Sequence, residues 1–260
     1  MIDWPREFLN LKIEDHLVRG SVDTGRFRHY GFQLWRGFLG SDELESLLAL
    51  EKEATSRPFH PVARDLDFAV ELAAITPPIR DRLATGFADL LGPGMGLTGA
   101  RFLRKESGES GTVSIHQDLG YHIGLFEQLS VFCSLNGADA SNGALTVVPG
   151  SHHLGYLGDA GSLEKFYPEQ AEVCASLAPG DALIMHCATI HSSSANQSTE
   201  ARKLFEILLC PQEQPWRIDN VLADEKTRCA FGSINPREHQ LFRSSRGQRL
   251  ARIRKALDDT

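Results

Sequence analysis

The chain has 260 residues, of which 42% are hydrophobic and 23% are charged, and this composition predicts a globular protein with one large core. Its net charge of −7 argues against a nucleic-acid partner, since phosphate binding needs a basic surface. Five cysteines without a C-x-x-C pair favour reduced thiols in a cytoplasmic protein over a disulfide framework or a zinc ribbon. No apolar run approaches the ~20 residues of a membrane helix, so we expect no membrane partner.

The N-terminal part of the chain is expected to contain the helices. Residues 1–27 look irregular or edge-like, and Gly31 to Phe38 alternates in part between apolar and polar residues, which predicts a strand. A helix is expected to follow, with Ser41 as its N-cap and acidic residues in its first turn. Helical spacing predicts a buried stripe made of Leu44, Leu47 and Leu48.

Two more segments precede the strand-rich region. Residues 65–74 have a mixed pattern that predicts a helix or a loop. A second helix is predicted over Ile79 to Leu91, because prolines at 77 and 78 suit the start of a helix and Gly92-Pro93-Gly94 ends it.

From Gly96 onward, short strand-like runs alternate with turn residues. The predicted strands span residues 97–104, 112–117, 129–135, 144–148, 172–177, 182–185 and 204–210. Helices followed by many short strands predict an α+β fold with a jelly-roll-like core braced by the helices.

We therefore expect a single domain over residues 1–260. Helical bracing is expected mainly in 1–95, the β-core at about 96–211 and a C-terminal extension at 212–260. A basic helix is predicted at 248–258, where either a docking surface or a solvated charged face explains the pattern.

The segment T-V-S-I-H-Q-D-L-G at 112–120 carries the first chemical signal. On a strand, His116 and Asp118 point to the same face and Gln117 points to the other. An imidazole beside a carboxylate is two thirds of a site that, with a second histidine, suits Fe(II) and leaves positions open for oxygen chemistry. A surface strand with outward polar residues would also contain such a triplet, so the motif alone leaves both interpretations open.

The remaining ligand is expected from a distant segment, where His186 and His191 are the candidates. His191 is favoured because Arg202 begins the next strand-like run eleven residues later, and a turn between antiparallel strands would bring the two together. The planar guanidinium of Arg202 suits a carboxylate in a buried pocket. His186 is predicted to be structural.

Several motifs together resemble the phytanoyl-CoA dioxygenase family of Fe(II)/2-oxoglutarate-dependent oxygenases. They are H-Q-D-L at 116–119, N-G-A-L-T-V-V-P-G-S-H-H at 142–153, G-D-A-L-I-M-H at 180–186, and I-H-S-S-S-A-N-Q-S at 190–198 with Arg202. The resemblance implies a double-stranded β-helix, the fold shared by jelly rolls and cupins. It implies iron held by His116, Asp118 and His191, and 2-oxoglutarate bound by Arg202 with Ser193 as a hydroxyl partner.

The implied activity is that of a 2-oxoglutarate-dependent dioxygenase. With O₂ it would hydroxylate or otherwise oxidise an unactivated C–H of a small-molecule metabolite and release succinate and CO₂. The chain would act as a monomer or a homodimer. The alternative is a non-catalytic sensor or scaffold of the same fold that binds metal and 2-oxoglutarate. A cupin-like isomerase fits less well, because the chain has no second H-x-H cluster and that chemistry has no use for Arg202.

The substrate pocket is expected at the mouth of the core. Its candidate lining residues are Gln117, Tyr121, His122, and either Arg104 or Lys105. Tyr121 and His122 fit a loop rim equally well. Residues 106–111 are polar and glycine-rich, which suits either a lid over the site or a plain surface loop.

Overall fold

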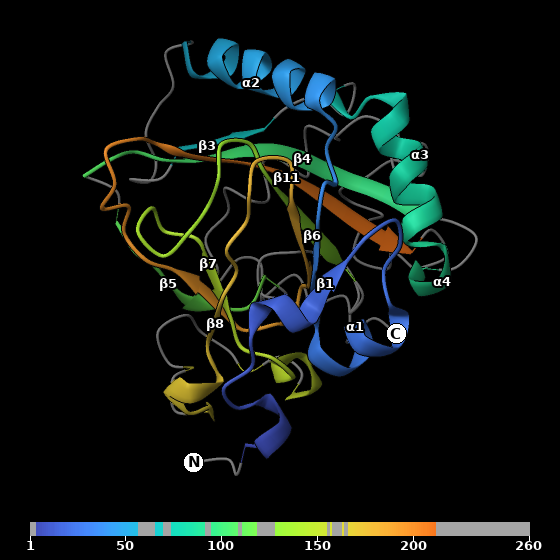
Figure 1. The fold of residues 1–260 in the computed structure, drawn as a ribbon, viewed down its shortest axis with the longest axis vertical. Helices are drawn as coiled ribbons and strands as arrows, with labels where there is room; N and C mark the ends of the chain where they lie inside the picture. The colour runs from blue at the N-terminus through green and yellow to red at the C-terminus, as the bar shows by residue number, and fades with distance from the viewer. Residues whose placement is uncertain are drawn as a thin grey trace, which may run out of the picture.

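The computed structural model describes residues 4–56, 66–69, 74–91, 95–108, 111–118, 128–154, 157, 163 and 166–211 (Figure 1). The predicted extension at 212–260, with its basic helix, lies outside these residues. None of the described helices is both long enough and apolar enough to span a membrane.

The strands form two sheets. The larger contains β1 (Leu17–Val18), β2 (Phe32–Trp35), β3 (Leu66–Ala69), β4 (Met95–Lys105), β6 (Leu129–Ser134), β9 (Ala182–His186) and β11 (Arg202–Pro211). Their order is β1-β2-β9-β6-β11-β4-β3, antiparallel except between β1 and β2. The smaller sheet contains β5 (Val113–His116), β7 (Leu145–Val147), β8 (Val173–Cys174) and β10 (His191–Ser193). Its antiparallel order is β5-β10-β7-β8.

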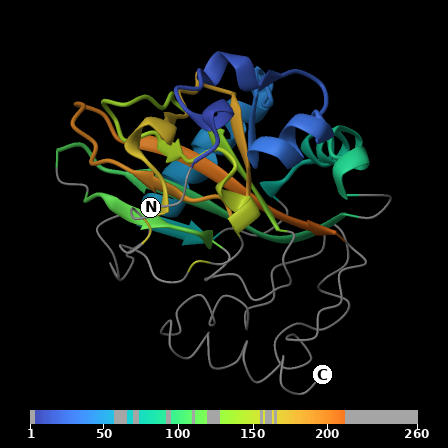
Figure 2. The ribbon, with the colours of Figure 1, turned by 90° about the horizontal axis from the view of Figure 1, so that it is seen from below.

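Helices cover one face of the larger sheet. The α-helices are α1 (Thr24–Tyr30), α2 (Ser41–Ser56), α3 (Pro77–Gly86) and α4 (Ala88–Leu91). Short 3-10 helices occur at η1 (Arg6–Phe8), η2 (Ile13–His16), η5 (Ser151–Leu154) and η7 (Glu169–Ala171). Figure 1 shows α2 and α3 beside β3, β4 and β11, and Figure 2 shows the ribbon turned by 90°. Leu47 of α2 and Leu83 of α3 pack in one cluster with Phe102 and Phe205 of the sheet.

The strands at the centre of the larger sheet are buried on both faces. Along β6, Val131 and Cys133 belong to the cluster under the helices, whereas Phe132 belongs to the cluster shared with the smaller sheet. Leu204 of β11 and Val147 of β7 also belong to the second cluster. The inner face of the larger sheet therefore packs against the smaller sheet, and side chains that alternate along one strand enter two different cores.

A buried carboxylate ties α2 to the larger sheet. Glu51 is 1% exposed, and its two carboxylate oxygens each lie 2.9 Å from a cation, Arg104 on β4 and Lys203 on β11. These two cations are opposite each other in the sheet. Arg104 therefore belongs to the outer, helix-covered face, away from the smaller sheet.

Three predictions for the N-terminal part need correction. Residues 1–27 include the edge strand β1, as expected, but they also contain the start of α1, whose N-cap Asp23 accepts a hydrogen bond from the Arg26 N–H at 3.0 Å. Ser41 is the first residue of α2 and not its cap. The carbonyl of Gly40 accepts the first helical hydrogen bond, and the Glu43 carboxylate accepts a bond from the Gly40 N–H at 2.7 Å. Residues 66–69 form the edge strand β3 where a helix or a loop was predicted, because they find a partner in β4.

The other element predictions agree with the structure, apart from their ends. The predicted helix at 79–91 is divided at Phe87 into α3 and α4. The strand predicted at Gly31 to Phe38 is β2, and the seven predicted from residue 96 onward correspond to β4, β5, β6, β7, β8, β9 and β11, while β10 is an additional strand in that region. An α+β organisation with a β-rich core is therefore present, whereas the jelly-roll winding and the single domain over 1–260 stay predictions.

One histidine is enclosed by aromatic rings at the start of the chain. His16 is 2% exposed, and its ring centroid lies 4.5 Å from that of Tyr30 and 4.7 Å from that of Phe32. Burial and the positive charge of Arg26 lower the pKa of His16 to about 4, although Asp15 opposes the shift. The native protein therefore holds this imidazole in its neutral form at neutral pH.

We expect His16 to make the protein sensitive to acid. Because the unfolded chain takes up this proton near pH 6.5 and the folded chain only near pH 4, stability falls as the pH falls through that window, by about 3 kcal/mol at most. Urea unfolding of the wild type and of His16→Phe at about pH 7 and about pH 4.5 measures this loss. The variant should lose less stability, and an equal loss in both proteins would contradict the prediction.

Candidate metal centre

Two histidines are brought together by the pairing of β5 with β10. His116 is the last residue of β5 and His191 is the first residue of β10, and they are direct partners in the antiparallel ladder. Their ring centroids lie 4.1 Å apart. Neighbouring strands are about 4.8 Å apart, so the sheet itself fixes the separation of these two side chains.

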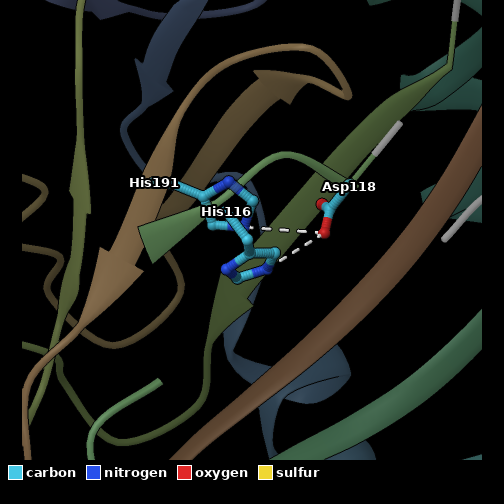
Figure 3. A group of neighbouring side chains, drawn as sticks. All are labelled: His116, Asp118 and His191. Carbon is cyan, nitrogen blue, oxygen red and sulfur yellow. Dashed lines mark ion pairs between the residues drawn. The ribbon is translucent and has the colours of Figure 1, made fainter. Parts of the chain in front are cut away.

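Asp118 completes the group from just beyond the end of β5 (Figure 3). Its Oδ1 lies 3.5 Å from Nε2 of His116 and 3.6 Å from Nε2 of His191. The prediction that His116 and Asp118 share one strand face is wrong in its detail, because the strand ends at His116. The two side chains nevertheless converge, and the three possible ligand atoms lie within 4.8 Å of one another.

The rings of both histidines are oriented by backbone carbonyls two residues earlier in the chain. Nδ1 of His116 donates to Ser114 O at 2.8 Å, and Nδ1 of His191 donates to Thr189 O at 3.0 Å. This fixes the hydrogen on Nδ1 and leaves the Nε2 lone pair of each neutral ring directed toward Asp118. Metal-binding histidines are held in this way.

The centre is electrostatically prepared for a cation. Burial opposes a charge on His116, but in the protonated ring Nε2 donates to Asp118, and this bond, the negative charge of Asp118 and the Ser114 carbonyl together raise the pKa of His116 above its ordinary value. Arg101 acts in the opposite direction. His191 and Asp118 are 3% and 6% exposed, so the negative charge of Asp118 lies in a place largely closed to solvent.

This donor set fits a metal ion. Ligand bonds of about 2.1 Å to one ion place neighbouring ligand atoms about 3 Å apart, so the separations of 3.5 and 3.6 Å between Asp118 and the two imidazoles need only a slight contraction. Two imidazole nitrogens and one carboxylate oxygen on one side of an ion are typical of non-haem Fe(II) oxygenases, and they leave open positions for other ligands. His186 is not part of this group, since its Nδ1 accepts the Ala188 N–H at 3.1 Å.

Arg202 approaches β10, the strand that carries His191, from the other sheet. It begins β11 in the larger sheet and is 5% exposed. Its NH1 donates to Gly143 O at 2.6 Å and to Ser193 Oγ at 3.3 Å. The predicted turn between paired strands is therefore wrong, because β10 and β11 belong to different sheets and Arg202 meets β10 at Ser193, two residues after His191.

Gly143, in the predicted N-G-A-L motif, makes this contact possible. Its φ is +80°, and a Cβ there would lie 2.5 Å from Ser194 O and 3.0 Å from Cδ of Lys105. Its carbonyl accepts hydrogen bonds from both Arg202 and Ser193, the latter at 2.7 Å. A residue with a side chain at this position would push Ser194 and Lys105 away.

Of the residues predicted to line the substrate pocket, those that the structure describes do not lie together on one face. Nε2 of Gln117 donates to Ala188 O at 2.7 Å and its Oε1 accepts the Leu157 N–H at 2.9 Å, so its amide connects two backbone segments. Arg104 faces the helices, whereas Lys105 is completely buried on the inner face. Tyr121 and His122 lie outside the described residues, as does part of the predicted lid at 106–111. A pocket role for Gln117 stays a prediction.

Comparison with known proteins identifies a family. The model of the family described as phytanoyl-CoA dioxygenase matches residues 27–204, more than half of the chain. Phytanoyl-CoA dioxygenase domain-containing protein 1 of Danio rerio is 29% identical over 137 residues, 46% of this chain and 47% of that protein. The matched segment thus spans about half the length of that relative.

Solved structures show the same fold at lower identity. The epimerase SnoN in complex with Fe³⁺, α-ketoglutarate and nogalamycin RO has a TM-score of 0.61 and 21% identity, covering 84% of this chain and 94% of SnoN. EctD from S. alaskensis with 2-oxoglutarate and 5-hydroxyectoine has a TM-score of 0.61 and 20% identity, covering 82% of this chain and 80% of EctD.

We expect the wild-type protein to bind one divalent ion at this centre. Loss of a group that merely supports a metal ligand costs 10- to 100-fold in affinity, so His116→Ala and Asp118→Ala should weaken Co(II) binding by at least about 100-fold. Isothermal titration with Co(II) measures this effect. His153→Ala is the control, because its ring bonds the His29 carbonyl away from the centre. Unchanged affinity in His116→Ala would contradict the assignment.

Gly143→Ala should destabilise the protein beyond the cost of its backbone angle. A left-handed alanine costs about 1–2 kcal/mol, and here a close contact with Ser194 O is added, so we expect about 3 kcal/mol or more in urea unfolding. Gly108→Ala is the matched control, since φ is +72° there and a Cβ would meet nothing within 4 Å. Equal losses in the two variants would contradict the steric argument.

Proposed function

The chain belongs to the phytanoyl-CoA dioxygenase family, and from this premise we propose that it is an Fe(II)- and 2-oxoglutarate-dependent dioxygenase. In this proposal His116, Asp118 and His191 hold the iron and Arg202 holds the distal carboxylate of 2-oxoglutarate. The reaction is hydroxylation, or a related oxidation, of an unactivated C–H in a small-molecule metabolite. The double-stranded β-helix arrangement belongs to the same proposal.

The observation that carries this proposal is the spacing between the metal group and the buried cation. His191 and Ser193 are two residues apart on β10, about 6.6 Å along a strand. One belongs to the metal group, and the other contacts Arg202. A five-carbon dicarboxylate can span this interval, with its 2-oxo acid end at the metal and its distal carboxylate at Arg202. The planar guanidinium suits that carboxylate.

Bound iron with 2-oxoglutarate would supply the activation of O₂, with succinate and CO₂ as products. The chain's own residues then have defined tasks. Ser114 and Thr189 carbonyls hold the imidazole rings in one orientation, and Asp118 supplies the negative charge. Arg202 binds and orients the co-substrate from a position that water hardly reaches.

A small organic substrate is supported by two proteins of the same fold. SnoN was solved with nogalamycin RO and EctD with 5-hydroxyectoine, both small molecules. We infer a small metabolite, handled by a single chain or a homodimer. The substrate itself is best sought by measuring succinate release over a panel of polar metabolites.

Anaerobic titration of the Fe(II)-loaded protein with 2-oxoglutarate tests the proposal. We expect a weak visible metal-to-ligand charge-transfer band in the wild type. Arg202→Ala should need about 10- to 100-fold more 2-oxoglutarate, because a hydrogen-bonded charge partner is lost. Asp118→Ala should give no band and no succinate.

The controls for this titration separate the outcomes. Arg36→Ala removes an arginine that pairs with Asp181 away from the centre, and it should leave the titration unchanged. Absence of a band in a folded wild type would contradict the proposal. A band without succinate over a broad substrate panel would favour a non-catalytic sensor.

A further inference from the structure

A lysine is buried beside the proposed 2-oxoglutarate site. Lys105 is 0% exposed and lies directly opposite Arg202 in the β4–β11 ladder, so both side chains point to the inner face. Burying the amino group of a lysine is costly unless it is hydrogen-bonded or paired. A buried lysine here therefore indicates a role for its amino group that an apolar residue of similar length could not fill.

Three hydrogen bonds connect Lys105 to the end of β10. Its Nζ donates to Ser193 Oγ at 2.7 Å, to Ser193 O at 3.1 Å and to Ser194 O. Three acceptors match the three hydrogens of the charged ammonium form. Lys105 thus connects the larger sheet to the smaller one through a positive group.

Ser193 links the two cations. Its hydroxyl accepts from Lys105 and from NH1 of Arg202 at 3.3 Å, and it donates its own hydrogen to Gly143 O. Because that hydrogen is directed to Gly143, the hydroxyl oxygen is free to accept from both Lys105 and Arg202. Two positive groups in contact with the same atom repel each other, and an anion between or beside them relieves this repulsion.

We propose that Lys105 is a positioning residue of the co-substrate site, which holds Ser193 and Arg202 in place and adds a second positive charge for the distal carboxylate of 2-oxoglutarate. This inference rests on the proposed function. It gives the site a selectivity: two cations favour a 2-oxo dicarboxylate over a 2-oxo acid of the same chain length without the distal carboxylate. Ser193 then acts by orienting the cations.

A purely structural role predicts something different. If Lys105 only joined β4 to residues 193–194, its loss would loosen the site for every 2-oxo acid or lower stability alone. If its charge serves the distal carboxylate, its loss weakens the dicarboxylate selectively. Comparing 2-oxoglutarate with 2-oxopentanoate separates the two cases, because both bind the metal through the same 2-oxo acid group.

The experiment measures both dissociation constants by anaerobic titration of the Fe(II)-loaded protein, using the charge-transfer band, with thermal unfolding recorded in parallel. Lys105→Met keeps the apolar stem and removes the charge. We expect its dissociation constant for 2-oxoglutarate to rise about 10- to 100-fold, while that for 2-oxopentanoate stays within about twofold of the wild type. Lys105→Arg, which keeps the charge, should retain much of the preference for the dicarboxylate.

Lys203→Met is the matched control. Lys203 follows Arg202 on β11 but points to the outer face, where it pairs with Glu51. Both dissociation constants should be unchanged in this variant.

Lys105→Met with unchanged 2-oxoglutarate affinity, or with equal weakening for both acids, would overturn the inference. If Lys105→Met does not fold, Lys105→Arg decides instead. Loss of the preference for 2-oxoglutarate over 2-oxopentanoate in this charge-keeping variant would overturn the inference. A wild type that binds neither acid would instead refute the proposed function.

Discussion

The antiparallel pairing of β5 with β10 is the constraint on which the candidate metal centre depends. It sets His116 opposite His191 at the spacing of neighbouring strands, and carbonyls of the same chain segments fix both rings. Asp118 then needs only to turn inward after the end of β5. A shift of the pairing by one residue would turn one imidazole to the other face of the sheet and remove the site.

The packing of the two sheets brings two cations to the end of β10. Arg202 and Lys105 project from the larger sheet and meet Ser193 of the smaller sheet, and Gly143 gives them room. The proposed metal ligands thus come from the β5–β10 region, while the cations come from the facing sheet. Stability and the proposed function are coupled here, because the contacts that hold the sheets together also position the two cations of the proposed co-substrate site.

Local sequence patterns predicted most of the secondary-structure elements. Alternation of apolar residues and turn residues located most of the strands, helical spacing located α2, and proline and glycine at its two ends located α3. The errors occurred where local patterns do not decide. Residues 66–69 became a strand because β4 offers an open edge, and the cap of α2 is Gly40 because the Glu43 carboxylate reaches back to it. These outcomes depend on a partner strand or on one side-chain rotamer.

The sequence by itself determined the chemical groups of the candidate site and the family: an H-x-D triplet, a later histidine and an arginine in a family-like order. Only the tertiary structure decided which side chains converge. It brought His191, which the sequence already favoured, together with His116 and Asp118, used Gln117 to connect two backbone segments, and buried Lys105 beside Arg202. The physical reason is that hydrogen-bond partners and burial come from segments far apart in the chain, and no local pattern encodes their distance.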